Sequence, residues 1–168
     1  MAYRNKTYVC FDGDNDIRYY NLMKAWKQND NTDFNFYDAH DLNTALDSSS
    51  EETIKRKLKE RLNNTKIFVI LLGEHTKNLT KFVKWEMEQA MAMELPIIVV
   101  NINGKRVKDN DLYPKNTLGN YLTINVSFNS KIMQYALEHW EDMHFKYKKE
   151  GKTGAYWYKE SVYKDLGL

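Results

Sequence analysis

The chain has 168 residues, with 25 basic against 23 acidic side chains and a formal net charge of +2. This near balance argues against a protein that binds nucleic acid or a membrane surface through a basic block, so we expect neither partner. A single Cys excludes a disulfide framework and a Cys-based zinc site. No signal peptide or membrane-length apolar run is evident, and we expect a reducing, cytoplasmic location.

The first expected element is a strand at 8–11, a short apolar run that ends in the acidic turn 12–16. A helix follows it, with an apolar stripe at the spacing of one helical face: Tyr19, Leu22, Met23 and Trp26. After a polar stretch, residues 34–37 are expected to form the second strand.

A second helix is expected after the polar loop 38–50. Ser48 and Ser49 each precede a Glu by three positions, which is the pattern of a capping box. The helix has an apolar stripe formed by Ile54, Leu58 and Leu62. The pair Asn63–Asn64 is a suitable C-terminal stop.

The third strand, 67–72, is continuously apolar, as expected of a central parallel strand that is covered on both faces. A third helix is expected near 81–94, followed by strands at 96–101 and, more weakly, at 121–128. Apolar residues at helical spacing then mark a last helix: Ile132, Ala136, Trp140 and Met143.

This alternation predicts an α/β three-layer sandwich, with a mostly parallel five-stranded sheet in the order 2-1-3-4-5. We expect residues 1–150 to form one domain and 151–168 to be an aromatic C-terminal extension packed on it. Ligands of such sheets bind beyond the C-terminal ends of the strands, where the strand order reverses. The expected site therefore comprises the loops 12–16, 38–50 and 73–80.

The loop after the first strand carries Asp12, Asp14 and Asp16, a spacing that also begins a calcium-binding loop. That interpretation fails, because the required Gly is replaced by Ile17 and the required Glu by Met23. The His residues show no metal-ligand spacing on one helical face either. We expect no metal.

Two other interpretations of the acidic loop remain open. A phospho-receiver would need its Asp at the end of the third strand, where the chain has Leu72-Gly73-Glu74. A helix cap by Asn15 or Asp16 accounts for part of the loop. It leaves Asp12 and Asp14 without an explanation.

The helix near 81–94 carries an acid on its apolar side. At about 100° per residue, the apolar arc contains Phe82, Val83, Met87, Ala90 and Met93. Glu86 falls inside this arc, where an unpaired charge costs several kcal/mol and the pKa is expected to rise. Because the helix begins at the ligand-binding edge, Glu86 is a candidate catalytic residue; the alternative is an ion pair with Lys or Arg.

Three segments, 8–20, 36–42 and 82–86, resemble the TIR-like proteins of the ThsB type. These proteins are the signal-producing subunits of Thoeris anti-phage systems. The likeness covers about residues 5–145, and its most specific part is the Trp85–Glu86 pair. The resemblance implies a flavodoxin-like TIR fold.

The resemblance also implies an enzyme of the NAD glycohydrolase, ADP-ribosyl cyclase or ADP-ribosyl transferase type. Such an enzyme cleaves the N-glycosidic bond of its substrate NAD and produces a nucleotide signal that activates a separate effector. The family's catalytic glutamate maps onto Glu86, and Phe11 and Trp85 are candidates to stack or to form walls. The remaining candidates for NAD contacts are polar: Asp12, Asp14, Asn15 and Asp38.

The alternative function is a non-catalytic TIR-like interaction module, because some TIR domains are adaptors. A cavity open at Glu86 favours the enzyme, whereas a self-associating face with Glu86 sealed in an ion pair favours the adaptor. The resemblance also makes self-association a possible partner interaction, since TIR enzymes commonly become active by assembling.

Overall fold

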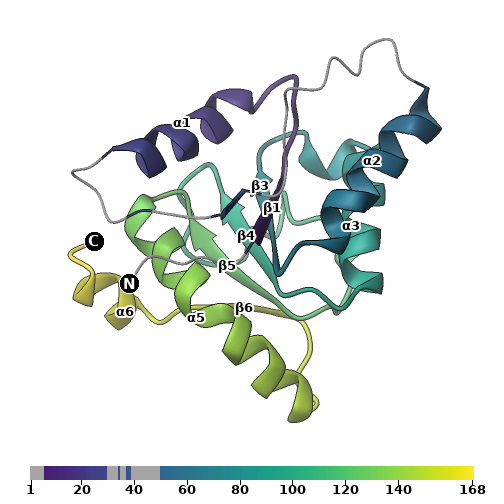
Figure 1. The fold of residues 1–168 in the computed structure, drawn as a ribbon. Coiled ribbons are helices and arrows are strands. Elements are labelled where there is room, and N and C mark those ends of the chain that lie inside the picture. Colours follow the sequence, from purple (N-terminus) through teal and green to yellow (C-terminus); the bar gives the residue numbers. More distant parts are fainter. Residues whose placement is uncertain (1–5, 30–33, 35–36, 39–49) are drawn as a thin grey trace.

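The computed structural model describes residues 6–29, 34, 37–38 and 50–168. In this part of the chain one sheet has the strand order β2-β1-β3-β4-β5-β6, and every neighbouring pair is parallel (Figure 1). Its strands are β1 (Lys6–Cys10), β2 (Tyr37–Asp38), β3 (Ile67–Leu72), β4 (Ile97–Asn101), β5 (Thr123–Ser127) and β6 (Ala155–Trp157). The predicted α/β fold and the order 2-1-3-4-5 are confirmed, with one strand more than the five expected.

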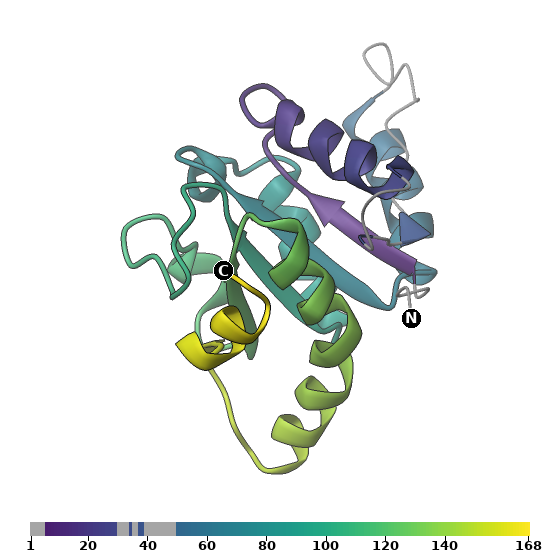
Figure 2. The same ribbon diagram turned by 90° about the vertical axis from the view of Figure 1, so that its left-hand side faces the viewer.

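The helices lie on both faces of the sheet and make three layers (Figures 1 and 2). They are α1 (Ile17–Gln28), α2 (Glu51–Asn63), α3 (Val83–Ala92), α4 (Lys115–Leu118), α5 (Ser130–Lys149) and α6 (Glu160–Asp165), with a short 3-10 helix η2 (Thr76–Asn78). One face is covered by α1, α5 and α6, and the other by α2, α3 and α4. No helix in the described ranges has the length and apolar character needed to cross a membrane.

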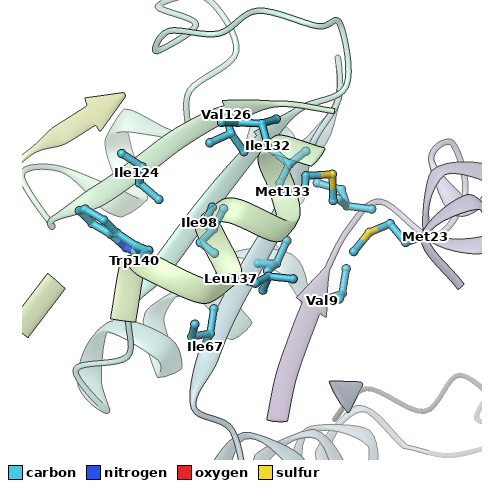
Figure 3. Packing of buried hydrophobic residues seen from close by; sticks show 14 of the residues in the cluster. Val9, Met23, Ile67, Ile98, Ile124, Val126, Ile132, Met133, Leu137 and Trp140 are labelled. Atoms are coloured by element: carbon cyan, nitrogen blue, oxygen red, sulfur yellow. The ribbon is translucent and has the colours of Figure 1, made fainter. Parts of the chain in front are cut away.

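The face under α5 carries a continuous apolar core (Figure 3). Leu137 and Trp140 of α5 point at the sheet, where they meet Ile98 of β4 and Ile124 of β5. All four side chains are at most 2% exposed. Because the central strands are covered on both faces, they have no polar side, which explains their uninterrupted apolar sequence.

The extra strand, β6, comes from the expected aromatic extension. Residues 155–157 pair with 123–125 of β5 instead of only packing on the domain. The Asn125 side-chain amide also donates a hydrogen bond to the Tyr156 carbonyl oxygen at 3.0 Å. Aromatic residues favour strands, and the pairing covers an edge of β5 that would otherwise expose its backbone groups.

Of the apolar stripe predicted for the first helix, Tyr19, Met23 and Trp26 pack on the core, and only Leu22 was wrong. Tyr20 and Met23 are the buried residues of α1, whereas Leu22 is 43% exposed. The Tyr20 ring stacks on Phe11, with ring centroids 4.8 Å apart and planes 15° from parallel. This contact with the end of β1 sets the rotation of the helix, which spacing along α1 alone does not reveal.

The predicted capping box of the second helix was also wrong. The N-cap of α2 is Ser50, whose hydroxyl oxygen accepts the Thr53 backbone N–H at 3.2 Å. Ser48 and Ser49 lie outside the described residues. The C-terminal stop was correct, because Asn64 is the C-cap of α2.

Candidate active site

A cavity of about 440 Å³ lies at the C-terminal edge of the sheet. The loop after β1 contributes Phe11, Asp12 and Asp14 to its wall, and the segment that leads into α3 contributes Lys81 and Glu86. Two of the three loops expected to form the site therefore border one hollow. The third, 38–50, lies almost wholly outside the described residues.

Glu86 is buried, with 6% of its surface exposed, and its side chain still borders the cavity. It shares the buried face of α3 with Val83, Met87 and Ala90, as the helical periodicity predicted. Within the described ranges no salt bridge involves this carboxylate. The expected alternative of an ion pair with Lys or Arg thus has no support in the structure.

The surroundings of Glu86 act on its charge in opposite directions. Burial raises the pKa of the carboxyl group, the nearby Tyr8 hydroxyl and Cys10 thiol of β1 lower it, and the net result is a rise from 4.5 to about 7. Burial prevails because few water molecules can solvate the charge, while two donors compensate only in part. Near pH 7 the group is therefore partly ionised and able to take either protonation state.

The loop after β1 is held together by Asp12, which is 1% exposed. One oxygen, Oδ1, accepts the backbone N–H groups of Asp14 at 3.0 Å and Asn15 at 3.2 Å. The other, Oδ2, accepts a hydrogen bond from the Asn15 side-chain amide at 2.7 Å. Asp12 and Asn15 thus hold the loop together. This role explains why the chain has an acid at position 12, for which helix capping gave no reason. Asp14 is exposed at the wall of the cavity.

Asp16 stands at the N-cap position of α1, but its side chain makes no capping hydrogen bond. The carboxylate instead lies against Gly73 at the end of β3, where an added Cβ would come within 2.2 Å of Asp16 Oδ2. Burial and the nearby Asp12 carboxylate raise the pKa of Asp16. The predicted cap is therefore corrected: Asp16 closes the space between β1 and β3, and only Gly at position 73 allows this approach.

The family model of the Thoeris protein ThsB, TIR-like domain, matches residues 8–107, more than half of the chain. The chain belongs to this family. The match includes every residue that lines the Glu86 cavity. A solved structure, "Crystal structure of conserved protein from Enterococcus faecalis V583", is 15% identical to this chain, with a TM-score of 0.47, and the alignment covers 98% of each chain.

One candidate NAD contact of this ThsB-type chain, Trp85, is not among the described residues that line the cavity. Trp85 is half-buried among residues of α2 and α3, with the Lys55 Nζ 5.7 Å from the centre of its ring. Asp38 is the last residue of β2, next to β1, and its side chain lies outside the described part of the structure. Trp85 is on α3 next to Glu86, but adjacent residues of a helix point about 100° apart.

The structure adds Tyr8 and Cys10 to the surroundings of Glu86, which the residue patterns did not indicate. The period of two along β1 places both side chains on the face that α3 covers. Their donor groups matter only because an acid lies opposite, and that pairing joins residues about 80 positions apart in the chain.

Proposed function

We propose that this protein is an NAD-processing signalling enzyme of Thoeris anti-phage immunity. It cleaves the bond between nicotinamide and ribose and converts the ADP-ribose moiety into a signal that activates a separate effector. One observation carries the proposal: a buried carboxyl group borders an open cavity and has no cationic partner in the described residues. Membership of the ThsB TIR-like family supports it.

The chemistry that we propose uses the charge of Glu86. Departure of nicotinamide leaves a ribose with oxocarbenium character, as in glycoside hydrolysis. A carboxylate beside that ribose stabilises the developing positive charge and accepts hydrogen bonds from the ribose hydroxyls. Burial strengthens this interaction, because the low dielectric around Glu86 screens the charges weakly. The cleaved ribose is then captured by water, by another atom of the same nucleotide or by an added small molecule.

A second cavity lies next to the Glu86 cavity. This second cavity has a volume of about 370 Å³, and Asn78 borders both hollows. Lys77 and Lys115 line the second cavity and carry positive charge. We place the nicotinamide riboside half of NAD beside Glu86, and the phosphates towards these two lysines.

The test compares nicotinamide release from NAD by the wild-type protein, Glu86→Gln and Glu88→Gln. Glu88 is a matched control, because it lies on the same helix but its side chain is 48% exposed. We expect Glu86→Gln to lose at least about 100-fold in rate, as when one group that stabilises transition-state charge is removed. Glu88→Gln should stay within about twofold of wild type, as exposed substitutions usually do.

The same three proteins are compared in phage-challenged cells, with the small molecules analysed by mass spectrometry, because assembly or infection is expected to activate the enzyme. A nucleotide product that forms equally with wild type and Glu86→Gln would contradict the role of Glu86. Absence of any nicotinamide release or nucleotide product, in cells that the wild-type protein defends, would support the alternative of a non-catalytic module.

A further inference from the structure

We propose that Phe82 makes the Glu86 cavity selective for a cationic ring: it is the surface on which the charged nicotinamide of the substrate rests. This inference rests on the proposed function and names the part of NAD that Phe82 contacts. The nicotinamide ring of NAD carries a positive charge, and an aromatic face attracts a cation that lies over it. The reduced dinucleotide and free nicotinamide lack that charge, so a cation-binding ring separates the substrate from both.

Phe82 shares a wall of the cavity with the proposed catalytic acid. It is the N-cap residue of α3, and its carbonyl oxygen accepts the Glu86 backbone N–H at 2.8 Å. Residues four positions apart on a helix are neighbours on one face, so the ring and the carboxyl group face the same side. Both residues line the Glu86 cavity. A ligand held against Phe82 therefore lies next to Glu86.

A cation already lies over this ring. The Lys81 ammonium is 5.2 Å from the centre of the Phe82 ring, within the range at which a cation and an aromatic face attract each other. Lys81 lines the same cavity, and its side chain is 64% exposed. Because an exposed side chain can swing away, a ligand that enters the cavity can take its place over the ring. Phe82 itself packs against the apolar core under α3, which holds the ring in position.

Lys81 has a second partner that remains when a ligand takes its place over the ring. Glu51 Oε2, at the start of α2, is 3.8 Å from Lys81 Nζ. The same carboxylate forms a salt bridge with Lys55 at 2.9 Å. The exchange replaces one cation over Phe82 by another, and the displaced ammonium keeps its contact with Glu51. No charge is left without a partner.

The acids of the cavity favour a cation as well, but they act differently from the ring. Asp14 lies on the wall formed by the loop after β1, and Glu86 borders the same space. Their attraction depends on distance and has no preferred direction. The Phe82 face attracts a cation only where it lies over the ring, within about 6 Å of its centre. Phe82 therefore fixes where the nicotinamide lies, and the acids add to the preference for its charge.

The preference for a cation suits the direction of the proposed reaction. When the bond between ribose and nicotinamide breaks, its electron pair stays on the nicotinamide nitrogen. Nicotinamide leaves as a neutral molecule, and the positive charge passes to the ribose beside Glu86. Phe82 then holds the product less tightly than the substrate, which favours product release. Because the contact weakens as the charge leaves the ring, it should affect substrate binding more than the chemical step.

The first measurement needs no turnover. The probes are nicotinamide and the methylnicotinamide cation, which is methylated on the ring nitrogen; neither contains a glycosidic bond. Their dissociation constants are measured by NMR titration of wild type, Phe82→Leu and Phe145→Leu. Phe145 is the matched control, an aromatic residue of α5 that is 45% exposed and is not among the residues that line the cavity.

Wild type should bind the cation about tenfold more tightly than nicotinamide, because the ring and the acids act together. In Phe82→Leu this preference should fall to about twofold, and in Phe145→Leu it should stay as in wild type. Equal affinity of wild type for the two probes, or no binding of the cation, overturns the inference. The same preference in wild type and Phe82→Leu overturns it too.

A third variant keeps the test decisive if Phe82→Leu does not fold. Lys81→Met changes an exposed side chain and removes the cation that competes for the ring. It should bind the methylnicotinamide cation about two- to threefold more tightly and leave the affinity for nicotinamide unchanged. Lys84→Met is the control, because Lys84 is an exposed residue of α3 that does not line the cavity. No gain for the cation in Lys81→Met contradicts the inference.

The second measurement separates this inference from the proposed function. In Phe82→Leu the KM for NAD should rise about fivefold while kcat stays within about twofold, as when a contact made mainly with the bound substrate is removed. A fall in kcat at unchanged KM would contradict a role of Phe82 in substrate binding. If wild type releases nicotinamide but shows no preference for the cation, this inference alone fails. If no variant releases nicotinamide, the proposed function fails, and the titrations still decide whether Phe82 selects a cation.

Discussion

At the scale of single residues, Glu86 imposes a cost in stability on the fold. Its pKa is about 7 in the folded protein, against 4.5 for an unperturbed Glu, so between these values the folded state binds more protons than the unfolded state. Stability contributed by this group therefore falls as the pH rises from about 4.5 to about 7. A shift of this size corresponds to about 3 kcal/mol. Such a cost is typical of a residue retained for function.

We therefore predict that Glu86→Gln is more stable than wild type at pH 8 and gains much less at pH 5, where Glu86 is already protonated. The measurement is the free energy of unfolding in urea at both pH values, with Glu88→Gln as the exposed control. A gain at pH 8 of about 1 to 3 kcal/mol is expected, because the variant removes the cost of burying a charge. If Glu86→Gln differs from wild type in unfolding free energy by the same amount at pH 8 and pH 5, the raised pKa of Glu86 is contradicted.

At the scale of an element, the loop after β4 is organised by one acid, Asp109, which is 2% exposed. The Asn103 side-chain amide donates to its Oδ2 at 2.8 Å. The backbone N–H groups of Asp111 and Leu112 donate to its Oδ1 at 2.9 and 3.0 Å. Burial raises the pKa of Asp109, but these hydrogen bonds and the nearby Lys105 ammonium together lower it to about 2. The loop reaches the second cavity through Asp111.

Asp109→Asn should destabilise the protein by about 2 kcal/mol at pH 7, because the charged hydrogen bonds are lost and an amide donor faces other donors. The lowered pKa means that this stabilisation is complete above pH 4 and is lost as the pH falls towards 2. Urea unfolding of wild type and Asp109→Asn at pH 7 and pH 3 tests this. The difference between the two proteins should shrink at the lower pH, and a constant difference would exclude the ionised form as the cause.

At the scale of the whole molecule, the C-terminal residues join the sheet and close the core beside α5 (Figure 2). Tyr163 of α6 is fully buried, and its hydroxyl accepts the Ser127 backbone N–H at 3.3 Å. The Arg106 guanidinium lies over its ring at 4.5 Å and forms a salt bridge with Glu160 at 2.8 Å. This arrangement links β6 and α6 to the loop after β4.

Tyr163→Ala should lower the free energy of unfolding by about 3 to 5 kcal/mol, as expected when a large buried aromatic side chain is removed. Glu160→Ala breaks the exposed salt bridge alone and should cost less than about 1 kcal/mol. Urea unfolding followed by both circular dichroism and tryptophan fluorescence measures the two effects. A single transition seen by both probes would show that residues 151–168 unfold together with the rest of the domain. Two separated transitions would contradict one cooperative unit.

The sequence by itself determined the alternation of strands and helices, the order of the first five strands and the position of Glu86 on the buried face of its helix. The elements and the buried face follow from local periodicity, which reports whether a position is buried, and the strand order follows from the connection rules of parallel α/β sheets. Only the tertiary structure decided which groups each of these side chains contacts. Asp12 accepts hydrogen bonds from its own loop, and Trp85 lies against α2. Tyr8 and Cys10 lie near Glu86 and lower its pKa. Periodicity carries no information on partners, because these contacts join elements that are distant along the chain.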